Sequence, residues 1–202
     1  MDEEIPIPSG LMSSSDSSML GDLSVAPRAA SFAGQDPGEV VYIIARRDII
    51  TTLGWVVRVG ILIISPIILI IILNNFNINL SPIIQGRFSV LILLAYYAFT
   101  FTYMVININD WFFNVFIVTN RRILDFDFKP LSSFTVAEAE LTAIQDVSES
   151  VIGVIPSFFD YGDLQIQTAG EKIKFIVKQI PRPTWLRNIL VDLARIAKNP
   201  EP

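Results

Sequence analysis

The feature that most constrains this chain is a pair of long apolar stretches that contain no charged residue. The first runs from Val59 to Leu80 and the second from Phe88 to Asn109. A helix needs about 20 residues to cross the hydrocarbon core of a bilayer. We therefore expect two transmembrane helices, over about residues 54–74 and 88–108.

The connection between these stretches is short and polar. It covers residues 74–87 and contains Pro82 and Gly86, which are typical of turns and loops. A short connection favours two antiparallel neighbours, so residues 39–110 are predicted to form a transmembrane hairpin. Pro66 lies inside the first helix and is expected to kink it, because its ring nitrogen cannot donate a hydrogen bond.

The residues that flank the hairpin suggest how it sits in a membrane. Trp55 and Trp111 bracket it on one side, and Arg58 lies one turn inside, where its long stem can bring the guanidinium back to the headgroups. These three residues are the predicted membrane-interface anchors. The segments that flank the hairpin also contain more basic residues than the connector, which contains Arg87. The flanking basic residues are Arg46, Arg47, Arg58, Arg121, Arg122 and Lys129. We expect a multi-pass protein of the cell membrane with both termini in the cytoplasm.

Composition excludes several classes of function. Residues 1–38 are rich in Ser, Asp, Pro and Gly and are predicted to be a disordered tail, with no cleaved signal sequence before the first helix. A net charge of -5 argues against nucleic-acid binding, which needs a clustered basic surface. The chain has no Cys and no His, which removes thiolate chemistry and the usual zinc ligands. We expect no enzymatic activity, no catalytic residue, no metal and no cofactor.

Beyond residue 111 the apolar residues alternate with polar ones, which is the period of β-strands. Strands are predicted at Val115–Thr119 and Ile123–Phe128, around a turn at Asn120–Arg121. Further strands are predicted at 134–141, 143–147, 164–168 and 172–178. After Pro181 the period becomes helical, with an apolar stripe formed by Trp185, Ile189, Leu193 and Ile196. Residues 111–198 should therefore form a mostly β domain, an open barrel or a sandwich, with a C-terminal helix.

Two acidic residues in the second predicted strand could be taken for a catalytic pair. Asp125 and Asp127 alternate with Leu124, Phe126 and Phe128, so the period of two places them on the opposite face of the strand. We predict that this acidic face is solvated and that the apolar face is buried.

Three motifs, taken in order, resemble a known family. They are Val118-Thr119-Asn120-Arg121-Arg122-Ile123-Leu124, Ile144-Gln145-Asp146-Val147, and the run from Tyr161 to Gly170. Together they resemble the bacterial pleckstrin-homology-like (PH-like) membrane proteins of the YdbS-like type, over roughly residues 40–198. The resemblance implies a PH-like barrel joined to a two-helix membrane hairpin, with no catalytic residues. The Ser-rich tail departs from that pattern.

Three functions remain open from the sequence. The leading hypothesis is a non-enzymatic adaptor, in which the hairpin anchors the chain and the domain binds a membrane or cytoplasmic protein, for example by strand addition at a sheet edge. The second is a module that binds lipid headgroups through Arg121, Arg122 and Lys129, each contributing roughly 1 kcal/mol near an anionic surface. The third is an accessory subunit of an oligomeric transporter, with Arg58, Asn107 and Asn109 facing a shared interior.

Overall fold

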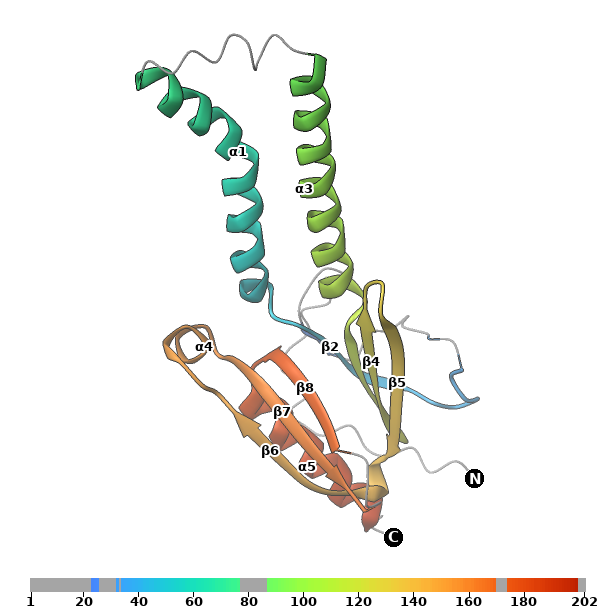
Figure 1. Ribbon diagram of the computed structural model, residues 1–202. Helices are drawn as coiled ribbons and strands as arrows, with labels where there is room; N and C mark the ends of the chain where they lie inside the picture. The colour runs from blue at the N-terminus through green and yellow to red at the C-terminus, as the bar shows by residue number, and fades with distance from the viewer. Residues whose placement is uncertain (1–22, 26–31, 33, 77–86, 170–173, 200–202) are drawn as a thin grey trace. The chain divides into compact units, whose positions relative to one another are not determined.

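The computed structural model of the chain describes residues 23–25, 32, 34–76, 87–169 and 174–199 (Figure 1). Contacts divide the chain into two units. We call residues 52–110 the helical hairpin, and residues 1–51 together with 111–202 the sheet domain. The sheet domain is therefore built from two separate parts of the sequence.

The helical hairpin consists of α1 (Leu53–Asn75) and most of α3 (Arg87–Phe113). Both helices are long and apolar enough to cross a membrane, and they contain the predicted spans. Their apolar side chains are largely exposed: Ile61 is 62% exposed and Leu94 is 65% exposed. The prediction of two long apolar helices is confirmed. The predicted connector lies mostly outside the described residues.

A proline in α1 determines how the two helices bind each other. Pro66 has no N–H to donate to the carbonyl of Leu62, four residues earlier. The Tyr96 hydroxyl of α3 donates to that Leu62 oxygen at 2.9 Å and also lies 2.7 Å from the Ser65 hydroxyl. The Leu62 oxygen, which the proline leaves without its helical partner, thus accepts from Tyr96 of the neighbouring helix and, at 3.0 Å, from the Ser65 hydroxyl of its own helix.

The first sheet has five antiparallel strands in the order β1-β2-β3-β4-β5 (Figure 1). Their bounds are β1 Leu23–Val25, β2 Val41–Arg46, β3 Val115–Thr119, β4 Arg122–Lys129 and β5 Ser133–Glu140. The predicted hairpin around Asn120 and Arg121 is confirmed, with Val118 opposite Ile123.

The second sheet has three antiparallel strands in the order β6-β7-β8. Its elements are β6 Ile144–Ser150, β7 Tyr161–Thr168 and β8 Lys174–Pro181, with the short helix α4 (Val154–Phe159) between β6 and β7. Two 3-10 turns, Ile49–Thr52 and Leu141–Ala143, complete the described elements of the sheet domain together with the C-terminal helix α5 (Pro183–Lys198).

One hydrophobic core joins both sheets to α5. Phe116 and Val118 enter it from the first sheet, Leu164 and Ile166 from the second, and Leu190 from the helix. The predicted helical stripe faces this core: Ile189 and Leu193 are buried, and Trp185 packs at its margin. The mostly β domain with a C-terminal helix is confirmed.

The boundary predicted between the two units is wrong at its N-terminal side. Residues 39–110 were assigned to the hairpin, but Val41–Arg46 is β2, a central strand of the first sheet. It pairs with β3, so that Arg46 lies opposite Val115. The helical hairpin is therefore inserted between two neighbouring strands of one sheet. Part of the predicted disordered tail is also ordered, since Leu23–Val25 pairs with β2.

Candidate functional site

A polar pocket opens between the two sheets, at the end of the sheet domain where the chain leaves for α1 and returns from α3. Its volume is about 120 Å³. Strands β2, β3 and β4 line one side and β8 lines the other. Its charged lining residues are Arg46, Arg47, Asp125, Asp127, Lys129 and Lys178.

The two aspartates of this pocket lie on the face of β4 that is turned toward the main core, whereas the sequence predicted that they lie on a solvated face. Asp125 lies opposite Phe116 in the register, and Phe116 belongs to the main core. Leu124 and Phe126 instead join a smaller apolar cluster on the other face of the sheet. Both faces of β4 are partly apolar, so the period of two identified the faces but not which of them is inside. The prediction of a fully solvated acidic face is wrong.

Electrostatics in the pocket are mixed. Burial and the neighbouring Asp127 raise the pKa of Asp125 to about 6, against the opposing effect of Arg47. Asp127 pairs with Lys129 at 3.1 Å, and Arg46 lies over the Phe112 ring at 5.1 Å from its centroid. Because Asp125 titrates near neutral pH, the charge of this pocket changes in that range.

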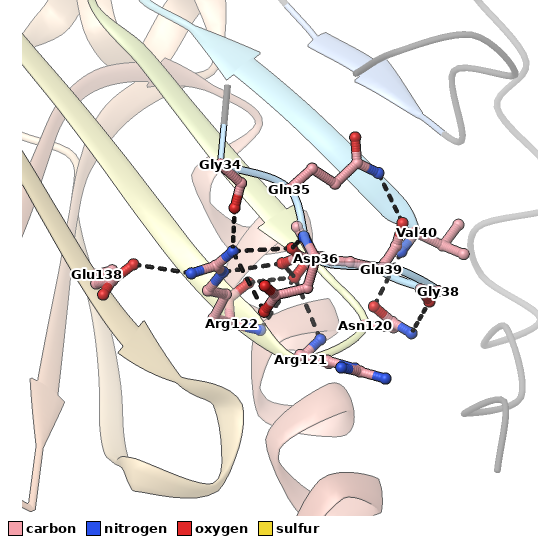
Figure 2. Close-up of polar contacts among 11 residues, drawn as sticks. Gly34, Gln35, Asp36, Gly38, Glu39, Val40, Asn120, Arg121, Arg122 and Glu138 are labelled. Carbon is pink, nitrogen blue, oxygen red and sulfur yellow. Dashed lines mark hydrogen bonds and ion pairs between the residues drawn. The ribbon is translucent and has the colours of Figure 1, made fainter. Parts of the chain in front are cut away.

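A second polar site holds the segment before β2 against the β3–β4 turn (Figure 2). The Glu39 carboxylate is fully buried and accepts four hydrogen bonds: from Arg122 Nε at 3.0 Å, Arg122 Nη2 at 2.9 Å, Thr119 Oγ1 at 2.8 Å and the Asp36 amide at 3.0 Å. Arg122 also donates to Glu138 at 3.0 Å and to the Gly34 carbonyl at 2.8 Å. This network joins residues more than 80 positions apart in the chain.

The network shifts the ionisation of its members. Burial by itself raises the pKa of Glu39, but hydrogen bonds from Arg122, the Asp36 amide and Thr119 outweigh it, so the pKa lies below 4.5. The Arg122 pKa is raised, chiefly by its hydrogen bonds to Glu39. Both groups therefore stay charged in the folded state near neutral pH.

The three basic residues predicted to meet lipid headgroups do not form one group. Arg122 is committed to Glu39 and Glu138, and its side chain is only 20% exposed. Arg122 begins β4, with Arg121 directly before it, whereas Lys129 ends the strand, about 23 Å from Arg122 at 3.3 Å per residue. Lys129 lies at the end where α3 enters β3, since Asn114 Oδ1 accepts a hydrogen bond from the Phe128 amide at 2.6 Å. Headgroup contact by these residues stays a prediction.

The predicted anchor residues have local partners. Trp111 Nε1 donates to the Arg47 carbonyl at 2.9 Å, which ties the two points where the chain leaves and re-enters the sheet domain. Arg58 Nε donates to the Gly54 carbonyl at 3.0 Å, one turn toward the start of α1. Trp55 is half-buried on α1. Asn107, named for a shared polar interior, donates its amide to Tyr103 of its own helix at 2.7 Å.

An edge of the first sheet is open to additional pairing. β5 is eight residues long and, within the described part of the chain, pairs only with β4. Its side chains are mostly exposed: Phe134 is 63% exposed and Val136 is 45% exposed. A long edge strand presents a row of backbone donors and acceptors to another chain.

Sequence reasoning missed Glu39 and the pocket residues Arg46 and Arg47 as parts of sites. The two arginines were used only to orient the hairpin, because β2 was not recognised as a strand. The acidic residue Glu39 directly precedes the run Val40–Ala45, which is the signal that could have marked a strand entry. Among the described residues, no group of three or more Asp, Glu, His or Cys side chains could hold a metal ion.

No protein-family model and no curated protein matches this chain. Among solved structures, it is similar to the crystal structure of a DUF1696 family protein with a pleckstrin-homology domain from Shewanella loihica. The two share 14% sequence identity, with a TM-score of 0.33, and the match covers 40% of this chain and 70% of the other. A TM-score of 0.33 is too low to establish a shared fold.

Proposed function

We propose that the chain is a membrane-anchored, non-enzymatic adaptor: the helical hairpin spans the cell membrane, and the sheet domain, a PH-like domain of the YdbS-like type, binds a protein partner in the cytoplasm. The open edge of β5 is the observation that carries the binding role. An extended segment of a partner can add to this edge through main-chain hydrogen bonds, with Val136 available to its side chains.

The pairing of β2 with β3 supports the membrane topology. Strand β2 precedes the hairpin and β3 follows it, yet they are neighbours in one sheet. Two helices that both cross a bilayer bring the chain back to its starting side, which this pairing requires. The excess of basic residues beside the hairpin favours the cytoplasm for that side.

The PH-like assignment draws on the sequence motifs and on the architecture of the sheet domain. Two antiparallel sheets pack on one core, and α5 covers that core at the C-terminal end of the chain. This is the mostly β arrangement with a C-terminal helix that the resemblance implies.

The adaptor proposal can be tested by photo-crosslinking in cells. A photoreactive residue at Glu138, on the open edge and away from the β4–β5 turn, should capture a partner that the same residue at Asp192, on the exposed side of α5, does not capture. Equal capture from both positions would argue against a site on the β5 edge.

Proline scanning then tests whether the edge itself is used. Consecutive residues of an antiparallel edge strand point their N–H groups alternately toward the sheet and away from it. Of Thr135→Pro and Val136→Pro, one should therefore fold normally. That folded variant should lose the crosslinked partner, and full retention of the partner would contradict strand addition.

The polar pocket favours a second function, the binding of an anionic lipid headgroup. Arg46, Arg47, Lys129 and Lys178 line it at the end where the chain enters and leaves, and its volume suits a phosphate group more than a larger ligand. Arg47→Glu combined with Lys178→Glu should weaken binding to vesicles that contain phosphatidylglycerol. The pair Arg195→Glu and Lys198→Glu, on α5 and outside the pocket, provides the control with an equal change of charge. Equal effects of the two pairs would exclude the pocket.

A further inference from the structure

A nine-residue segment between β6 and β7 presents apolar side chains to solvent. Residues 151–159 have no charged side chain, and they contain α4. Six large apolar side chains are exposed, by between 37% and 86%: Val151, Ile152, Val154, Ile155, Phe158 and Phe159. At 3.6 residues per turn, the four that lie on α4 fall within an arc of about 140°. We call this segment the α4 tip.

The first sheet has an apolar tip of its own at the β4–β5 turn. Leu131 is 94% exposed at this turn, and Phe134 follows it at 63%. Rings continue from here toward the end of α3, since Phe134 lies 6.4 Å from Phe128 and Phe128 lies 5.1 Å from Phe113. We call this the β4–β5 tip.

Both tips lie at the end of the sheet domain where the chain leaves for α1 and returns from α3. Near the α4 tip, the Arg182 amide donates to Asp160 at 2.8 Å, and the Asp48 amide, five residues before α1 begins, donates to Gln179 of β8 at 2.7 Å. Near the β4–β5 tip, Asn114 joins α3 to β3 and accepts the Phe128 amide. Figure 1 shows α4 at the end of the second sheet where β6 and β7 are joined.

Ser157, a polar residue of the α4 tip, makes its hydrogen bonds within the tip itself. The Ser157 hydroxyl donates to the Gly153 carbonyl at 2.8 Å, and the Ser157 amide donates to the same oxygen at 3.2 Å. Pro156, in the first turn, has no N–H to satisfy. Ser157 therefore needs no partner outside the tip when the tip enters an apolar medium.

We propose that the α4 tip and the β4–β5 tip insert into the interfacial layer of the bilayer that the hairpin spans, so that the sheet domain is seated on the membrane. This inference rests on the proposed membrane anchoring. The connection to α1 is the reason to expect a bilayer at these tips. The five residues from Asp48 to Leu53 reach about 17 Å at most, so this end of the sheet domain stays near the membrane surface. A short helix with a wide apolar arc and two adjacent Phe residues suits an interfacial position.

Depth-dependent quenching tests the proposal on the full chain. The protein has no cysteine, so single-cysteine variants carry one label each. The variants Ile155→Cys, Phe158→Cys and Leu131→Cys, each labelled with the fluorophore NBD, are reconstituted in phosphatidylcholine vesicles containing one quarter phosphatidylglycerol. Glu140→Cys, at the other end of β5 from Leu131, is the control in the same domain. Ile68→Cys, midway along α1, reports the hairpin.

We expect blue-shifted emission and quenching by lipids with a shallow doxyl group at the three tip positions, and neither effect at Glu140. Water-like emission at the tips, or a blue shift that lipid quenchers leave unchanged, as in a contact with a second copy or another protein, would overturn the proposal. The Ile68 label separates tip insertion from membrane anchoring by the hairpin. If deep doxyl lipids quench the Ile68 label while the tip labels stay unquenched, only the insertion is refuted. If they do not quench the Ile68 label, the anchoring itself is refuted.

Discussion

Replacing Glu39 by Gln tests the network that holds β2 to the β3–β4 turn. Each carboxylate oxygen of Glu39 accepts one hydrogen bond from Arg122 and one from another donor. The variant keeps the size of the side chain, but it removes the negative charge and replaces one acceptor oxygen by an NH₂ group, which cannot accept either of that oxygen's two bonds. Hydrogen bonds to a charged group contribute about 1.5–3 kcal/mol and neutral ones about 0.5–1.5 kcal/mol. Two lost bonds, one weakened bond from Arg122 and a partly buried guanidinium without its main partner give an expected loss of about 3 kcal/mol. Full loss of a buried pair costs about 3–5 kcal/mol, but Arg122 keeps Glu138.

Glu138→Gln is the matched control, since it removes an acid that also binds Arg122. Its side chain is 62% exposed and its ion pair lies at the surface, so the expected loss is about 0.5 kcal/mol or less. Urea unfolding of the full chain in detergent micelles gives both values. Replacing Trp55 by Phe throughout leaves Trp111 and Trp185, which both belong to the sheet domain, as the fluorescence signal.

The pH dependence of Glu39→Gln has a definite sign. The folded-state pKa of Glu39 is lowered, so its contribution is present above the unfolded value of about 4.5 and is lost as the pH falls through the folded value. The difference between wild type and Glu39→Gln should therefore shrink below about pH 4. The reasoning is refuted if Glu39→Gln costs no more than Glu138→Gln at neutral pH, or if the difference persists undiminished in acid.

Three further predictions follow from individual contacts. Asp125→Asn should stabilise the sheet domain near pH 7 and have little effect near pH 4, because the pKa of Asp125 is raised from 3.8 to about 6 and its ionisation therefore costs stability as the pH rises. This shift sets an upper bound of about 3 kcal/mol on the gain, and access of water reduces the expected gain to about 1 kcal/mol. Urea unfolding at both pH values measures it. Tyr96→Phe should lower the stability of the helical hairpin by about 1 kcal/mol, measured by thermal unfolding in detergent with circular dichroism. Tyr97→Phe should cost less, because its acceptor, the Ile63 carbonyl, is not freed by a proline. The reverse order would contradict the role given to Pro66. Gly162→Ala should destabilise the sheet domain by about 1–3 kcal/mol in the same urea assay, since its Cβ would lie 2.7 Å from a backbone carbonyl oxygen of β6; an unchanged midpoint would contradict this close packing.

Elements with a clear local pattern, either a long uncharged run or a regular hydrophobic period, could be predicted from the sequence. The two apolar helices lack charges over more than 20 residues, and the stripe of α5 repeats at helical spacing, so each identifies its own structure. β2 could not be recognised in this way. Its residues Val41, Tyr42, Ile43 and Ala45 are all buried, so no alternation exists, and the run lies just before a membrane-type segment to which it was assigned.

The sites were less accessible to sequence reasoning because they depend on distant contacts. Glu39 meets Arg122 only after β2 and β3 have paired, and nothing local marks either residue as buried. Asp125 was placed on the wrong face because Leu124 and Phe126 form a second apolar cluster outside the main core. The α4 tip has no sequence period of its own, and its only sequence signal is a stretch of ten residues without charge between Glu149 and Asp160.

Because β2 and β3 are neighbours in space but separated by the helical hairpin in sequence, synthesis of the chain and completion of its sheet cannot coincide. In the proposed membrane topology, a nascent β2 emerges with no β3 to pair with and must wait while both helices are made and inserted. A chain whose second helix failed to insert would strand β3 across the bilayer from β2 and could not close its sheet. Correct assembly of the sheet domain thereby reports that insertion has succeeded.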